Sequence, residues 1–170
     1  MTRHCLAVVV LVALTCSLAR LARTANPDGV HPDPAAGGAH HILVLPDAVE
    51  WHDAPPSMPR GAKVAVLEGD PAKPGFFAMR AKMPDGYRIG PHWHPGVERV
   101  TVLAGTFHLG NGEKFDKSAA RAMPAGTYSS MQPGMKHFGW AEGETIIQVA
   151  TEGPWGITYV DPNDDPRNGK

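Results

Sequence analysis

Residues 86–105 read GYRIGPHWHPGVERVTVLAG, and this stretch carries two histidines and one glutamate between two glycines. Successive side chains of a β-strand point to opposite faces, so His92 and His94 share a face. The turn signal Pro95-Gly96 ends their strand. Glu98 then opens a second strand close to the point where the first one ends. The spacing therefore predicts that two imidazoles and one carboxylate lie together without any helix.

A fourth polar ligand must come from another part of the chain. His137 is the candidate, because it follows a glycine-containing turn at 132–134 and begins the apolar run 138–140. Neutral imidazole suits zinc, copper, iron and nickel, and a carboxylate extends the choice toward manganese and iron. We expect one divalent metal ion, Fe, Mn, Ni, Cu or Zn; the alternative is a pocket of the same residues that holds no metal. The expected metal ligands are His92, His94, Glu98 and His137.

Short apolar or alternating runs, separated by turn-forming residues, fill the chain after residue 62, and none has helical periodicity. This spacing predicts an all-β fold, and closure into a barrel would remove exposed sheet edges. Asn111-Gly112 is a hairpin signal, which predicts that 106–109 pairs with 114–115. Residues 116–122 are expected to form one helical turn or a loop. The expected strands are 63–67, 76–82, 87–93, 97–103, 106–109, 127–131, 137–141, 145–150 and 155–160.

The first stretch resembles the first motif of the cupin superfamily, which reads G-x5-H-x-H-x3-E-x6-G. The positions that match it are Gly86, His92, His94, Glu98 and Gly105. The second cupin motif, G-x5-P-x-G-x2-H-x3-N, is matched at Gly126, Gly134 and His137. Gln132 stands at its proline and Ala141 at its asparagine, which is not a metal ligand in cupins. The second half is therefore the looser match.

The resemblance covers roughly residues 64–160 and implies a single small cupin β-barrel, a jelly-roll-like double-stranded β-helix. It implies that the three histidines and Glu98 bind a divalent metal inside the barrel. It further implies a metal-dependent enzyme, dioxygenase- or isomerase-like, acting on a small organic molecule. The alternative is a non-catalytic module that binds or senses a metal or small ligand.

The wall of the expected pocket can be sketched from strand alternation. If Glu98 points inward, Val100 does so too, and that part of the wall is apolar. Phe77 and Met79 share one face of their strand and Arg80 takes the other. We expect Phe77 and Met79 to point into the pocket and Arg80 to point outward, because a buried arginine needs a partner. The candidate wall residues are Phe77, Met79, Val100, Phe107 and Gln148. The sequence assigns no catalytic acid or base.

The first two dozen residues are typical of a secretory signal peptide. A short basic start precedes the apolar run 5–19, and a small-x-small cleavage site ends at Ala19, with a poorer one at Ala25. The run is short for a membrane span and is followed at once by Arg20. A lipid anchor at Cys16 is an alternative. We expect an exported protein, periplasmic or secreted, without a stable membrane span after cleavage.

The expected organisation is a signal peptide at 1–25, a flexible Pro/Gly-rich arm at 26–41, a cupin domain at 42–160 and a frayed polar tail at 161–170. Both cysteines, Cys5 and Cys16, lie in the signal segment, so the remaining chain offers neither a disulfide nor a thiolate ligand. Exchange of an arm formed by residues 26–45 could support a homodimer.

Charge and motifs narrow the classes of partner. The formal net charge is −1 and no basic run occurs, which argues against nucleic acid. The chain has no G-x-S-x-G, Walker-type loop or dinucleotide fingerprint. A small-molecule ligand or substrate is the expected partner.

Overall fold

The computed structural model describes residues 41–169, and these residues form an almost entirely β structure. The expected all-β class is confirmed. The strands are β1 (His52–Asp53), β2 (Lys63–Glu68), β3 (Gly75–Met83), β4 (Arg88–Trp93), β5 (Glu98–Asn111), β6 (Arg121–Pro124), β7 (Tyr128–Met131), β8 (His137–Gly153) and β9 (Thr158–Tyr159). Four 3-10 turns accompany them: η1 (Pro46–Ala48), η2 (Lys117–Ala119), η3 (Pro162–Asp164) and η4 (Pro166–Asn168). The expected signal peptide and most of the expected arm lie outside the described residues.

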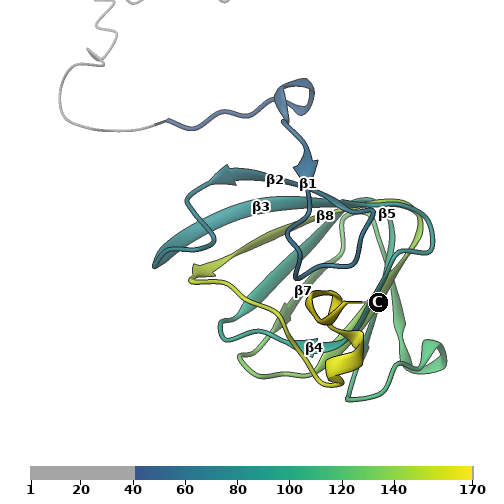
Figure 1. The fold of residues 1–170 in the computed structure, drawn as a ribbon. Coiled ribbons are helices and arrows are strands. Elements are labelled where there is room, and N and C mark those ends of the chain that lie inside the picture. The colour runs from purple at the N-terminus through teal and green to yellow at the C-terminus, as the bar shows by residue number, and fades with distance from the viewer. Residues whose placement is uncertain (1–40, 170) are drawn as a thin grey trace, which may run out of the picture. The chain divides into compact units, whose positions relative to one another are not determined.

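Two long antiparallel strands organise the curled sheet (Figure 1). β5 has 14 residues and β8 has 17, and they are hydrogen-bonded along most of their length. The second half of β8 also pairs with β3, whereas its first residues pair with β4. β5 in turn pairs with β7 near its start and with β6 near its end. Because β4 and β3 both join β8, the sheet curls around a common interior.

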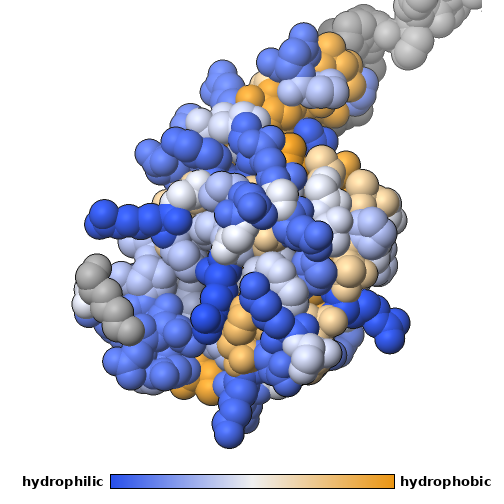
Figure 2. Space-filling view, turned by 90° about the vertical axis from the view of Figure 1, so that its right-hand side faces the viewer, coloured by the Kyte–Doolittle hydropathy of each residue, from blue (hydrophilic) through white to orange (hydrophobic). Residues whose placement is uncertain are grey.

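The interior is filled by the inward-facing residues of these strands. Val102 and Phe77 are fully buried, and Val100 and Val149 are nearly so. Strand alternation explains which residues are buried, since the neighbours Leu103 and Phe76 on the same strands point to the other face and are exposed. Figure 2 shows a mostly hydrophilic outer face with scattered apolar patches. Ile42, Leu43 and Leu45, which precede η1, are exposed apolar residues, and the homodimer expected through this arm stays a prediction.

Several local expectations were wrong. The strands expected at 137–141 and 145–150 are one strand, β8, and only Thr158–Tyr159 of the expected strand 155–160 forms, as β9. Strand 97–103 does not end before Gly105: β5 continues to Asn111, because the glycine allows a bulge where a strand break was expected. Segment 106–109 pairs with β6 rather than with 114–115, since residues 112–120 fold as a longer loop containing η2. The tail is not frayed but forms η3 and η4, where Arg167 donates to the Ile157 carbonyl oxygen at 3.1 Å.

The close approach of β5 to β8 requires a glycine at position 105, where φ is +71°. A Cβ there would lie 2.4 Å from the Glu144 carbonyl oxygen and 2.6 Å from Thr145 Oγ1. Gly143 has nearly the same φ, +69°, but a Cβ there would meet nothing within 4 Å. A side chain at position 143 would cost only the left-handed backbone conformation, whereas one at position 105 would also clash with β8.

We expect Gly143→Ala to lower the free energy of unfolding by about 1 kcal/mol, the cost of the left-handed backbone alone. Gly105→Ala should lower it by roughly 3 kcal/mol or more, because the backbone of β8 must also move. Urea unfolding of both variants measures the difference. Equal losses would contradict the close approach.

Candidate metal centre

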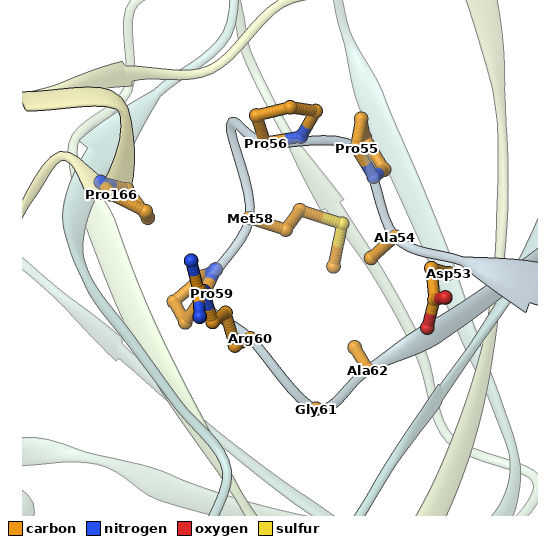
Figure 3. A pocket seen from close by; sticks show the side chains of 10 residues that line it. All are labelled: Asp53, Ala54, Pro55, Pro56, Met58, Pro59, Arg60, Gly61, Ala62 and Pro166. Carbon is orange, nitrogen blue, oxygen red and sulfur yellow. The ribbon is translucent and has the colours of Figure 1, made fainter. Parts of the chain in front are cut away.

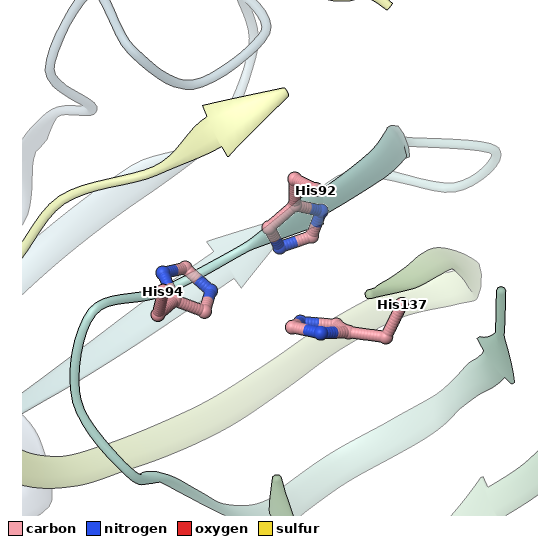
Figure 4. A group of neighbouring side chains, drawn as sticks. All are labelled: His92, His94 and His137. Atoms are coloured by element: carbon pink, nitrogen blue, oxygen red, sulfur yellow. The ribbon is translucent and has the colours of Figure 1, made fainter. Parts of the chain in front are cut away.

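Three histidine side chains from two neighbouring strands point toward one another (Figure 4). His92 lies in β4 and His94 just after it, while His137 is the first residue of β8. His92 and His137 are direct partners across the β4–β8 ladder. All three side chains are buried, and their nearest ring nitrogens lie within 4.8 Å of one another. The three residues could together hold a metal ion.

Each ring is oriented by a backbone carbonyl. His92 Nδ1 donates to the Gly90 oxygen at 2.8 Å, His94 Nδ1 to the Gly156 oxygen at 2.7 Å, and His137 Nδ1 to the Met135 oxygen at 2.9 Å. A carbonyl oxygen only accepts, so each Nδ1 carries a hydrogen and each Nε2 is directed to the common centre. This is the arrangement that fixes the tautomer of histidine ligands in metal sites.

Glu98 lies beside two of these rings. Its Oε2 atom is 3.2 Å from His137 Nε2 and 3.5 Å from His94 Nε2, and only 8 % of the residue is exposed. The carboxylate stands at the first residue of β5, where Thr151 Oγ1 donates to the Val97 oxygen. The sequence-predicted residues His92, His94, Glu98 and His137 are thus brought into one cluster, with Glu98 closest to His137.

The electrostatics of the cluster follow from burial and from the one carboxylate. Burial, with repulsion from the other two histidines, lowers the pKa of His92 to about 3, and burial also lowers the pKa of His94. Burial opposes the charged forms of Glu98 and His137, but their mutual hydrogen bond and attraction lower the pKa of Glu98 and raise that of His137. Two neutral imidazoles and one carboxylate therefore face the centre.

One atom of the cluster has no hydrogen-bond partner. His94 Nε2 is fully buried and unpaired, a costly state for a polar atom in a protein interior. A divalent cation at the centre would be a suitable partner, because it accepts an imidazole lone pair and is attracted by the carboxylate. The donor set of nitrogen and oxygen atoms fits such an ion.

A cavity of about 370 Å³ opens beside His92, His94 and Glu98. Among the sequence-predicted wall residues, Met79 lines it. Phe77, Val100 and Phe107 are instead packed in the core around it, with exposures of 0 %, 2 % and 5 %. Gln148 lies on the other face of β8, where its Oε1 accepts from Arg80 Nε at 3.2 Å. Arg80 faces away from the cavity, as expected.

Sequence reasoning missed the loop that follows β8. Trp155 lines the cavity and stacks on His94, with ring centroids 4.1 Å apart and planes 14° apart. The next residue, Gly156, supplies the carbonyl that orients the same histidine. The run Gly153-Pro-Trp-Gly156 signals a turn, but nothing local indicates that the turn lies against His94.

A second hollow of about 440 Å³ is lined by the loop from Asp53 to Ala62 and by Pro166 (Figure 3). None of the candidate ligands lines it. Its wall is made of prolines, small residues, Met58, Asp53 and Arg60, and carries no cluster of metal-ligating side chains. The larger hollow is therefore not the candidate site.

Comparison with known proteins now adds the family. A family model described as a domain of unknown function, DUF4437, matches residues 21–158. The chain belongs to the DUF4437 family. A search of curated proteins found no match. Within the part of the DUF4437 chain that the structure describes, no helix is long and apolar enough to cross a membrane.

Solved structures similar to this DUF4437 chain have the cupin fold. The polyketide cyclase RemF from Streptomyces resistomycificus matches with a TM-score of 0.63 and 16 % identity, over 76 % of this chain and 92 % of that one. An acetylacetone dioxygenase from Acinetobacter johnsonii matches with a TM-score of 0.57 and 14 % identity, over 78 % of this chain and 85 % of that one. An RmlC-like cupin from Shewanella frigidimarina matches with a TM-score of 0.51 and 15 % identity, over 66 % of this chain and 91 % of that one. At these identities the likeness establishes the fold, which agrees with the cupin resemblance of the two motifs.

The carbonyl contacts predict the tautomers of the metal-free protein. We expect His92 and His94 to be neutral with the hydrogen on Nδ1. His108, on the outside of the sheet, serves as the control, because its Nε2 lies 2.6 Å from Glu142 Oε2 and must carry a hydrogen. Long-range proton–nitrogen NMR correlations distinguish the two forms. A hydrogen on His94 Nε2 would contradict the assigned orientation.

Proposed function

We propose that the protein binds one divalent metal ion through His92, His94, His137 and Glu98, and that this centre belongs to a metal-dependent enzyme acting on a small organic molecule. The observation that carries the proposal is the set of three inward Nε2 atoms, each fixed by a carbonyl behind it, with His94 Nε2 buried and unpaired. A divalent cation at the centre would give the buried His94 Nε2 the partner that it lacks.

The chain's own residues define what the site can do. The metal supplies Lewis acidity, a template for a polar group, or redox chemistry when it is bound. Four protein ligands leave positions free on a metal that accepts six. The cavity beside His92 and His94 gives a small molecule access to those positions. Dioxygenase- or isomerase-like chemistry is supported by the fold alone, which hosts many activities.

The loop of residues 55–59 borders the cavity. Pro55, Ser57 and Met58 line it, and two buried tyrosines hold this loop from inside the barrel. Tyr87 Oη donates to the Pro59 oxygen at 2.7 Å, and Tyr159 Oη donates to the Ser57 oxygen at 2.9 Å. Burial raises the pKa of both tyrosines. Their hydroxyl hydrogens are engaged with the loop carbonyls, so the two tyrosines hold the loop in place beside the cavity.

A non-catalytic binding module is the second candidate, and one observation favours it. Apart from the proposed ligands, Asp70 is the only ionisable side chain among the described residues that line the cavity. Its Oδ1 accepts from the Ala72 amide at 2.9 Å and its Oδ2 lies 2.8 Å from Lys73 Nζ, so it is not a free base. Product formation from a bound compound supports the enzyme, whereas tight binding without product supports the module.

Metal content is the first measurement. We expect about one iron, manganese, nickel, copper or zinc ion per chain in protein purified without a histidine tag, and less than a tenth of that in the double variant His92→Ala/His137→Ala. Glu98→Gln should weaken metal binding at least tenfold, because it removes the only negative ligand. His108→Ala, outside the site, is the control and should keep its metal. A parent protein that stays metal-free after reconstitution would rule out the proposal.

We also propose export, supported by the apolar run 5–19 and the small-x-small sequence that ends at Ala19. The N-terminal sequence of protein recovered from its host tests this. A start after Ala19 or Ala25 is expected, a lipid-blocked start at Cys16 would indicate a lipoprotein, and an intact Met1 in the cytoplasmic fraction would contradict export.

A further inference from the structure

Beyond the proposed metal ligands, most of the cavity wall is aliphatic. β2, β3, β4 and β8 each turn a branched or straight apolar side chain inward. The residues are Val64, Met79, Ala81, Ile89, Ile147 and Val149. Trp155 completes the wall beside His94. A ligand that extends away from the metal centre therefore meets mostly hydrocarbon, although Ser57 and Asp70 also line the cavity.

The basic residues of the same strands are placed on the opposite face. Arg80 is bonded to Gln148, Lys82 Nζ lies 4.6 Å from the centre of the Trp51 ring, and the Arg88 guanidinium lies 3.7 Å from the centre of the Phe115 ring. Between residues 41 and 169, no lysine or arginine lines the cavity. An anionic group beyond the metal centre would have no cationic partner.

The polar residues that line the cavity, Asp70 and Ser57, do not provide a cationic partner for an anion either. Asp70 brings a negative charge to the cavity, and its partner Lys73 has a side chain that is 76 % exposed and does not line the cavity. The Ser57 carbonyl already accepts the Tyr159 hydroxyl. Burying an unpaired carboxylate or phosphate among aliphatic side chains is strongly unfavourable. Because Lys73 balances the charge of Asp70, the described residues offer the cavity no free cation, and its aliphatic walls give an anion no compensation.

Resting on the proposed metal centre, we infer that the ligand is a molecule with one polar, metal-binding end and an uncharged apolar body, and that the cavity discriminates against sugar acids, dicarboxylates and phosphorylated compounds. The polar end lies at the imidazoles and Glu98, and the body lies along β2, β3 and β8. The observations that carry the inference are the mostly aliphatic walls, the outward placement of Arg80, Lys82 and Arg88, and the absence of lysine and arginine from the described residues that line the cavity.

Three hydroxamic acids with the same metal-binding end separate the two parts of the cavity. Acetohydroxamic acid carries the polar end alone, hexanohydroxamic acid adds an apolar body, and adipic acid monohydroxamate has the same number of carbons but ends in a carboxylate. Binding to the zinc-loaded protein is measured by calorimetry, with zinc content determined on the same samples. We expect the hexanoyl compound to bind at least tenfold more tightly than either of the others.

A charge placed in the wall provides a matched test. Ile157 lines the cavity and is partly buried. The variant Ile157→Lys should reduce the preference for the hexanoyl compound over the adipic compound at least tenfold. Leu103→Lys places the same charge at a residue of β5 that is 40 % exposed and outside the cavity, and it should leave the preference unchanged.

The outcomes separate this inference from the proposed function. Zinc-loaded protein that binds the adipic compound as tightly as the hexanoyl compound would overturn the inference and leave the metal centre intact. Protein that retains no zinc would remove the proposed function and the inference with it. If Ile157→Lys does not fold, the comparison of the three compounds on the parent protein still decides.

Discussion

The hydrogen bonds from three histidine Nδ1 atoms to backbone carbonyl oxygens are the constraint on which the site depends. Gly90, Met135 and Gly156 supply these oxygens from three separate segments of the chain. Each bond fixes a ring plane and a tautomer, and together they direct three Nε2 atoms to one point. The orientation of each ring is therefore set by the backbone, in β4 for His92, in the turn before β8 for His137 and in the loop after β8 for His94.

The long β5–β8 ladder makes this arrangement possible. His137 begins β8 and Glu98 begins β5, and β4 joins the ladder at His137 through His92. The Gly134 amide donates to the His94 carbonyl oxygen at 2.9 Å, which ties the turn before β8 to the end of β4. Residues far apart in sequence are thus connected by backbone bonds before any side chain contributes. The bulges around Gly105 let the same two strands curl rather than run flat.

The sequence was sufficient where the controlling interaction is local. Alternation on a strand predicted that His92 and His94 share a face and that Arg80 turns outward, and the structure agrees. The pairing of strands that are distant in sequence could not be predicted from local patterns. The hairpin signal Asn111-Gly112 was overridden because residues 106–109 found partners in β6 and β8. Trp155 was missed for the same reason, since its contact with His94 joins residues that are distant in sequence.

The loop after β8 has two roles that cannot be separated: Gly156 orients His94, and Trp155 forms the wall beside it. The segment from Pro55 to Met58 also borders the cavity, but it supplies none of the carbonyl oxygens that orient the histidines. A substitution in the loop after β8 would therefore alter the orientation of His94 and the wall of the cavity together. A substitution at Pro55 would alter the wall without changing any of the three carbonyls that orient the histidines.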